Sequence, residues 1–168
     1  VPIDQYCEGK PLETVLDLFL QVCSAIEAAH RALIVHRDIK PANVLVTAEG
    51  ESRLLDFGIA KEVADTPEER AQQTTTQAYT LHYASPEQME GGDITVASDV
   101  YSLGALLYRL LSGRVPHAGT SSALGQLQAI QTTQPQKPSR VVAENLAIPD
   151  FERRKRHVQA GEKLGDLG

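Results

Sequence analysis

Five polar side chains that could take part in group transfer lie close together in the segment "IVHRDIKPANVLV". A solvated turn would account for their polarity, but it does not need an acid beside a base with an amide close behind. A carboxylate at Asp38 can orient a hydroxyl group and accept its proton, and Lys40 can offset negative charge on a transferred group. Asn43 offers an amide oxygen, a hard ligand of the kind that Mg²⁺ prefers. The five residues are His36, Arg37, Asp38, Lys40 and Asn43.

A second carboxylate, Asp56, is predicted to lie near Asn43 across a β-hairpin. Two short β-type runs, Val44 to Val46 and Arg53 to Leu55, flank the turn-rich sequence "TAEGES". Antiparallel pairing then places Asn43 opposite Asp56, next to Asp38. Carboxylate and amide oxygens in this arrangement would hold the metal ion that phosphoryl transfer requires. The predicted register pairs Val44 with Leu55 and Val46 with Arg53.

Three helices are predicted to carry the polar segment and the hairpin. The first runs from Leu12 to Leu33, and Pro11 suits its first turn. The second, Ser98 to Leu111, is apolar on nearly every face, as is typical of a helix at the centre of a core. Ser98 is its expected N-cap and Gly113 its expected C-cap. A weaker helix follows from Ser121 to Gln131. The apolar positions of the first helix are Leu12, Val15, Leu16, Phe19, Val22, Cys23, Ile26 and Leu33.

Composition favours one globular domain with a buried core. The chain has 168 residues, 42% of them hydrophobic, and a formal net charge of -6. The acidic balance argues against nucleic acid or a membrane surface as a partner. Cys7 and Cys23 lack metal-type spacing and are interpreted as reduced thiols, which favours a cytoplasmic location. No apolar run is long enough to span a bilayer, and the start "VPIDQYC" does not resemble a signal peptide. A membrane segment outside this chain is compatible with this interpretation.

Three of these segments, taken in order, resemble the signature motifs of protein kinases. His36 to Asn43 resembles the catalytic loop, Asp56-Phe57-Gly58 the metal-binding DFG triplet, and Ser85-Pro86-Glu87 the APE motif. A fourth segment, "SDVYSLG", resembles the start of the family's central buried helix. The resemblance implies a protein-kinase-like C-terminal lobe. Lys40 and Thr80 resemble the residues that the serine/threonine-specific branch of the family has at these places. The sequence "YASPEQ" resembles that of bacterial kinases of this branch.

The resemblance assigns roles to single residues. It implies that Asp38 is the catalytic base and aligner and that Lys40 is a cation on the phosphate side. It implies that Asn43 and Asp56 bind Mg²⁺ or Mn²⁺ with ATP, and that Leu45 lies under the adenine. Thr80 would contact the catalytic residues on the substrate side. Structural roles are implied for His36, Phe57, Gly58, Glu87 and Asp99, with Asp99 bracing the backbone of the catalytic loop.

A regulatory role is predicted for the polar stretch of residues 61–80, which is expected to form a long loop. Thr74, Thr75 and Thr76 offer hydroxyl groups on this loop. Phosphorylation of one of them would add about 1.5 to 2 negative charges, which a guanidinium can bind through two hydrogen bonds. We therefore expect a phosphate on one of these threonines to order the loop onto Arg37.

The resemblance covers only part of a kinase. The segments before His36 contain neither a glycine-rich phosphate loop nor a strand lysine. The chain is therefore expected to be a partial C-terminal lobe that begins near the hinge and needs a small lobe as its partner. Residues 1–149 are predicted to form the partial kinase domain, and residues 150–168 a charged linker or the truncated end of the same lobe. Such a fragment is expected to be inactive by itself.

Two alternatives stay open beside a kinase that phosphorylates serine or threonine in protein substrates. The first is a pseudokinase or docking fragment, which the missing small lobe favours and the intact Asp38, Asn43 and Asp56 oppose. The second is a small-molecule kinase of the aminoglycoside type, which shares an H-x-D loop but generally lacks a segment ending in "SPE".

Overall fold

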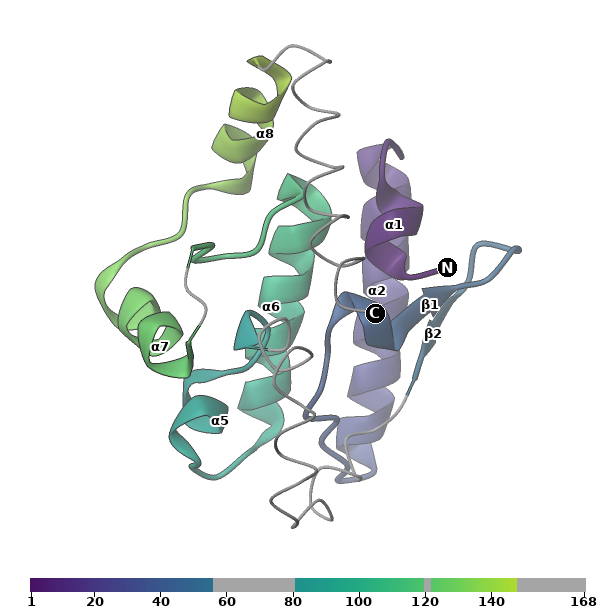
Figure 1. The fold of residues 1–168 in the computed structure, drawn as a ribbon. Helices are drawn as coiled ribbons and strands as arrows, with labels where there is room; N and C mark the ends of the chain where they lie inside the picture. The colour runs from purple at the N-terminus through teal and green to yellow at the C-terminus, as the bar shows by residue number, and fades with distance from the viewer. Residues whose placement is uncertain (56–80, 120–121, 148–168) are drawn as a thin grey trace, which may run out of the picture. The chain divides into compact units, whose positions relative to one another are not determined.

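The computed structural model describes residues 1–55, 81–119 and 122–147. It divides the chain into two compact units, Val1–Pro135 and Gln136–Gly168. The predicted fold class, mainly helical with a small β-hairpin, is confirmed. In chain order the elements of the first unit are α1 (Ile3–Cys7), α2 (Leu12–Arg31), the 3₁₀ helix η1 (Pro41–Asn43), β1 (Val44–Val46), β2 (Ser52–Leu54), α5 (Pro86–Glu90), α6 (Val96–Ser112) and α7 (Ala123–Thr132), as Figure 1 shows.

Helix α2 is the predicted first helix, and it ends two residues earlier than expected. Pro11 precedes its first turn, and Ala32 is its C-cap. Leu33, predicted to be its last residue, has a left-handed φ of 60° and is 93% exposed. Leu12 and Leu16 are also exposed, because the buried stripe runs along another set of positions. The buried residues of α2 are Val15, Leu18, Val22, Ile26 and Ala29.

Helix α6 packs beside α2 and begins two residues before the predicted start (Figure 1). The N-cap is Thr95, whose hydroxyl accepts a hydrogen bond from the N–H of Ala97 at 3.2 Å. Ser98, the predicted N-cap, instead lies in the first turn, where its hydroxyl accepts a bond from the N–H of Thr95. The two side chains form a capping box. Gly113 is the C-cap, as predicted, with a left-handed φ of 71°.

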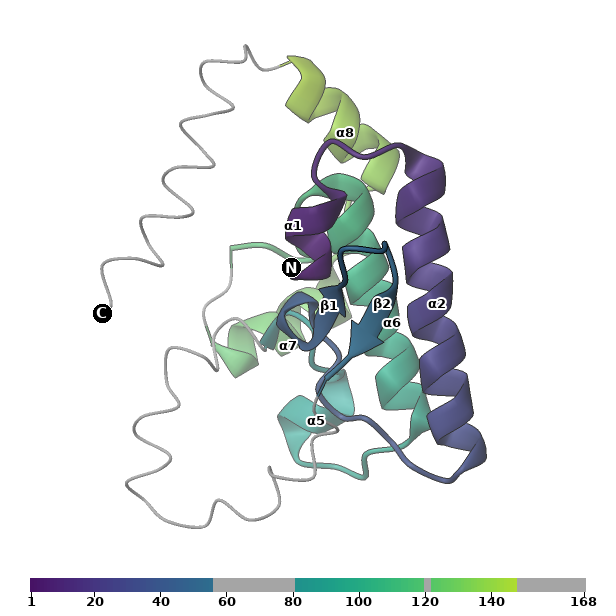
Figure 2. The same cartoon turned by 90° about the vertical axis from the view of Figure 1, so that its right-hand side faces the viewer.

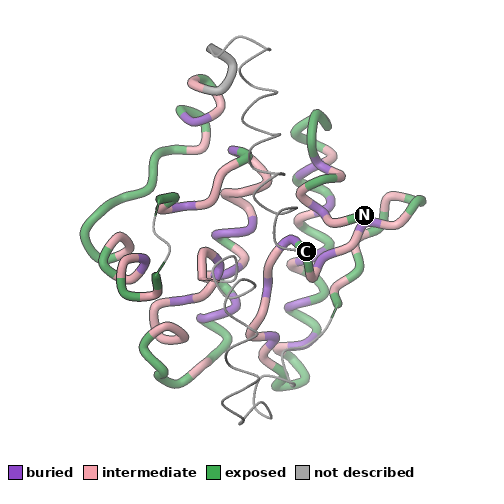
Figure 3. The backbone as a smooth tube through the Cα atoms, viewed as in Figure 1, coloured by how far each residue is buried: buried purple, intermediate pink, exposed green. Residues whose placement is uncertain are grey.

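The faces of α6 differ more than its sequence indicates. Val96 and Val100 are exposed near its start, whereas Asp99, Ala105 and Leu106 are buried. Figure 3 shows buried and exposed positions along the same helix. The prediction of a helix buried on nearly every face is therefore wrong for its first turns.

The β-hairpin forms between the predicted segments, but its register is shifted by one residue. Val44 pairs with Leu54, Leu45 with Arg53 and Val46 with Ser52. Directly paired residues share a face of the sheet, so Leu54 lies on the buried side with the valines, and Arg53 is exposed. The predicted register would have placed Arg53 beside Val46 on the buried face, where a charge is costly.

The N-terminal residues extend this small sheet on its other side, a feature that the sequence did not indicate. The amino group of Val1 donates to the carbonyl of Val46 at 3.0 Å, and the N–H of Val46 donates to the carbonyl of Val1 at 2.8 Å. Pro2 forms an isolated bridge with Leu45. Helix α1 follows directly and packs against β1, as the turned view in Figure 2 also shows.

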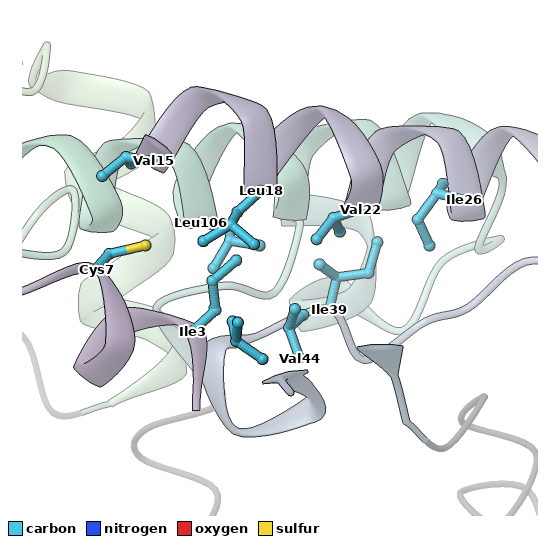
Figure 4. Packing of buried hydrophobic residues seen from close by; sticks show 10 residues of the cluster. Ile3, Cys7, Val15, Leu18, Val22, Ile26, Ile39, Val44 and Leu106 are labelled. Atoms are coloured by element: carbon cyan, nitrogen blue, oxygen red, sulfur yellow. The ribbon is translucent and has the colours of Figure 1, made fainter. Parts of the chain in front are cut away.

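The hydrophobic core joins α1, α2, the hairpin and α6. Side chains from these elements face one another in Figure 4, among them Ile3, Leu18, Val44 and Leu106. Ile39 also belongs to this cluster. Since Ile39 lies between Asp38 and Lys40, the core anchors the polar segment from inside. The buried members of the cluster are Ile3, Cys7, Val15, Leu18, Val22, Ile26, Ile39, Val44, Val46 and Leu106.

The two cysteines are free thiols, as predicted. Cys7 is buried in the core and Cys23 is half-buried, so only Cys7 is a core residue. Burial raises the pKa of both thiols above their ordinary value.

The second unit contains α8 (Pro138–Ala147), which the sequence analysis did not predict. Along this helix, the Arg140 Nε lies 3.3 Å from the Glu144 Oε1, one helical turn further on.

The predicted helix from Ser121 to Gln131 corresponds to α7 of the first unit, whose N-cap is Ser122. None of the helices in the described ranges is long and apolar enough to cross a membrane.

Candidate active site

Asp38, Lys40 and Asn43 converge in the short segment between α2 and β1. The Asp38 carboxylate lies 2.9 Å from the Lys40 ammonium and 2.9 Å from the Asn43 amide nitrogen. The side chains of Asp38 and Lys40 are 12% and 15% exposed. The carboxylate is thus held by two donors and is still reachable from solvent, as a group that must meet a hydroxyl substrate needs to be.

The 3₁₀ helix η1 fixes the orientation of Asn43. The side-chain nitrogen of Asn43 donates to both the backbone carbonyl and the carboxylate of Asp38, at 2.8 and 2.9 Å. Because both partners are acceptors, the NH₂ of the amide must point at Asp38, and its oxygen takes the opposite branch. That oxygen fits the role of a metal ligand. The N–H of Leu55 donates to the Asn43 carbonyl at 2.8 Å, so Asn43 lies opposite Leu55 and not opposite Asp56 as predicted.

His36 ties the segment that carries Asp38 to the end of the hairpin. Its side chain is fully buried. Its Nδ1 accepts a hydrogen bond from the N–H of Asp38 at 3.3 Å, and its Nε2 lies 3.0 Å from the carbonyl of Leu55. A carbonyl only accepts, so Nε2 carries the proton and the ring is neutral with Nδ1 unprotonated. This geometry suits a structural role.

Asp99 of α6 holds the backbone of the same segment. Its carboxylate is completely buried and accepts hydrogen bonds from the N–H groups of His36 and Arg37, at 2.8 and 2.9 Å. The Nε2 of His30, near the end of α2, lies 2.7 Å from the same carboxylate. Three donors, one from α2 and two from the loop that follows it, therefore satisfy a charge that would be costly if it were buried alone.

His30 and Gln88 belong to this site and were missed by the sequence analysis. His30 is one polar residue in the last turn of an amphipathic helix, where a cation is common for other reasons. Gln88, in α5, donates from Nε2 to the carbonyl of Arg37 at 2.8 Å. The motif match did suggest that α5 matters, but nothing in the spacing pointed to a contact between residues 37 and 88.

Glu87, also in α5, contacts the start of α6. The Ser98 hydroxyl donates to its carboxylate at 2.5 Å. That hydrogen bond is the main cause that lowers the pKa of Glu87 below its ordinary value. Within the described part of the chain, Glu87 thus links α5 to the helix that carries Asp99.

Several predicted site residues lie outside the described residues. Leu45 is described, and it is half-buried on β1. No group of three or more His, Cys, Asp or Glu side chains that could hold a metal occurs among the residues with described structure. The metal role of Asp56 stays a prediction, and so does a phosphate on a threonine, which phosphate mapping would test. The residues outside the description are Asp56, Phe57, Gly58, Thr74, Thr75, Thr76 and Thr80.

The fold and the site together fit the protein kinase family. The family model for the protein kinase domain matches residues 8–159, so the chain belongs to the protein kinase family.

Within this family, the chain is similar to several bacterial serine/threonine-protein kinases. The chain is 45% identical over 134 residues, or 80% of its length, to "Serine/threonine-protein kinases drp72" of Corynebacterium efficiens. It is 40% identical over 149 residues, or 88% of its length, to PknA of Corynebacterium glutamicum. It is 42% identical over 120 residues, or 71% of its length, to PrkC of Bacillus subtilis. These relatives are named serine/threonine-protein kinases, and the matches cover 25%, 31% and 18% of their respective lengths.

Proposed function

We propose that this chain is part of the C-terminal lobe of a protein kinase that transfers the ATP γ-phosphoryl group to serine or threonine hydroxyls of protein substrates. The observation that carries the proposal is the Asp38 carboxylate, 2.9 Å from both Lys40 and Asn43, on a segment whose backbone is bonded to buried Asp99. Residues 1–149 would form this part of the domain. A small lobe supplied by the rest of the kinase would complete the nucleotide site.

Each residue has a defined task in this proposal. Asp38 orients the substrate hydroxyl and takes its proton as the oxygen attacks the γ-phosphorus of ATP, whose bond to the departing ADP breaks. Lys40 is close enough to Asp38 to neutralise it at rest, and it offsets charge on the phosphoryl group during transfer. The amide oxygen of Asn43 would bind the metal together with Asp56. The metal, Mg²⁺ or Mn²⁺, supplies charge neutralisation on the ATP phosphates when it is bound.

The direct test replaces Asp38 by Asn in the full-length kinase. The variant keeps the size of the side chain and removes the proton acceptor, so turnover should fall by about 10²- to 10⁴-fold. Asp17→Asn is the matched control, because Asp17 is an exposed carboxylate on α2. Peptide phosphorylation with labelled ATP measures the turnover of both variants. A wild-type rate in Asp38→Asn would contradict the proposal, and ATP binding without turnover in the wild type would favour the pseudokinase alternative.

A further inference from the structure

Arg37, directly before Asp38, has a backbone conformation that its own chemistry disfavours. Its φ is 71°, in the left-handed region. For a residue with a side chain this conformation is strained, and it persists only where surrounding groups determine it. The groups that hold the peptide bonds of Arg37 therefore also set the position of the Asp38 backbone.

Hydrogen bonds hold both sides of Arg37. On one side, its N–H donates to the Asp99 carboxylate at 2.9 Å. On the other side, its carbonyl accepts from the Nε2 of Gln88 at 2.8 Å. The second bond fixes the plane of the peptide that joins Arg37 to Asp38, because that carbonyl and the Asp38 N–H belong to the same planar unit. The Asp38 N–H in turn donates to His36.

Gln88 is bonded at both ends of its amide. Its Oε1 accepts from the N–H of Ser85 at 2.9 Å, while its Nε2 serves Arg37. Ser85 is the N-cap of α5 and is fully buried, so this end is anchored. A donor at one end and an acceptor at the other match a primary amide and no other side-chain group of this shape. A glutamate here would direct a carboxylate oxygen at the Arg37 carbonyl, and a methionine would offer nothing to either end.

We propose that Gln88 is a positioning residue for the reaction. It bridges Ser85, the N-cap of α5, to the peptide that precedes the catalytic Asp38. Through this bridge, the position of the start of α5 controls whether the Asp38 carboxylate is in line with its substrate. The proposal rests on the proposed kinase function.

The test uses two substitutions of Gln88 in the full-length kinase. Gln88→Glu keeps the acceptor for Ser85 but loses the donor to Arg37 unless the new carboxyl is protonated. Gln88→Met is similar in size and loses both bonds at every pH. In both variants, kcat should fall on the order of tenfold near neutral pH, with little change in KM for ATP. A misplaced Asp38 carboxylate impairs proton transfer from the substrate hydroxyl and leaves nucleotide binding unaffected. Gln128→Glu, an exposed glutamine on α7, is the matched control for charge.

The pH dependence separates positioning from a general structural effect. As pH falls from about 8 toward about 5, protonation of the introduced glutamate restores a donor, so the rate of Gln88→Glu relative to wild type should rise. The relative rate of Gln88→Met should stay flat. Wild-type kcat in both variants would overturn the proposal, and so would an equal, pH-independent loss in both.

A measurement without catalysis keeps this test distinct from that of the kinase function. Amide hydrogen exchange in the segment from His36 to Lys40 should be faster in both Gln88 variants than in Gln128→Glu. If the wild type shows no turnover, the proposed function fails and the exchange data still decide on the bridge. Unchanged exchange in an otherwise active kinase would overturn the bridge alone.

Discussion

A single buried carboxylate explains much of the geometry around Asp38. Asp99 is fully buried, and its two oxygens accept from the backbone of His36 and Arg37 and from the ring of His30. Hydrogen bonds to a charged acceptor are stronger than neutral ones, and removing one donor leaves part of the charge unsatisfied. His30 is the one of these three donors that belongs to a side chain, so it can be substituted without altering the backbone of the segment that carries Asp38.

His30→Ala should therefore destabilise the fold by about 1–3 kcal/mol, since it removes a donor from a buried carboxylate. The adjacent Arg31→Ala is the control. The Arg31–Glu27 ion pair is exposed, so its loss should cost at most about 1 kcal/mol. Urea unfolding of both variants measures the difference. Equal free energies of unfolding for the two variants would show that the His30–Asp99 contact contributes no more than a surface pair.

At the scale of helices and strands, the sequence predicted which long elements exist better than it predicted where they begin and end. The long helices α2 and α6 have clear periodicity, so both were predicted. The start of α6 was misplaced because Thr95 and Ser98 are both good N-caps and the capping box uses both. The register of the hairpin was wrong because three-residue strands carry little pattern to align. Helices α1 and α5 have five residues each, too few for a helical repeat to show.

His82, in the segment before α5, should make the free energy of unfolding depend on pH. Burial is the main cause that lowers the pKa of His82 below its ordinary 6.5, although a hydrogen bond with Gln126 of α7 opposes the shift. The unfolded chain then takes up a proton at higher pH than the folded one does. The stabilising contribution is present above pH 6.5 and is lost as the pH falls from 6.5 toward the folded pKa.

His82→Gln should make the free energy of unfolding less dependent on pH in this window. Burial also lowers the pKa of His117, so His117→Gln should remove a separate part of the dependence. The two effects should add in the double variant if the sites are independent. Urea unfolding at about pH 7.5 and about pH 5.5 measures the change. An unaltered pH dependence in His82→Gln would show that the ring titrates alike in the folded and unfolded states.

At the scale of the whole molecule, the site joins residues that are far apart in the sequence. The local cluster from His36 to Asn43 was predictable because it lies in one short segment and matches a known motif. The contacts of Asp99 with His30 and of Arg37 with Gln88 span 69 and 51 residues. Neither leaves a local pattern, because a polar residue that reaches across the fold looks like any other polar residue on its own helix. Only the packing of α2, α5 and α6 brings them together.

The two thiols should report on opening of the whole fold. Cys7 is buried in the core and Cys23 is half-buried, and burial raises both pKa values, which lowers the fraction of reactive thiolate. A short pulse of alkylating reagent should modify Cys23 slowly and Cys7 more slowly still, and denaturant should expose both. Mass spectrometry of the labelled peptides gives the two rates. Fast labelling of Cys7 in native conditions would mean that α1 detaches without global unfolding.

The edges of the small hairpin also affect whether copies of this chain aggregate at high concentration. A short sheet normally presents open strand edges, which are templates for adding a strand from a neighbouring copy. Here the outer side of β1 is already bonded to Val1, and adjacent Pro2 has no N–H to offer. On β2, the N–H of Ser52 donates to the side chain of Gln21 at 2.8 Å. The backbone that positions Asn43 is therefore shielded from edge-to-edge aggregation by groups of its own chain.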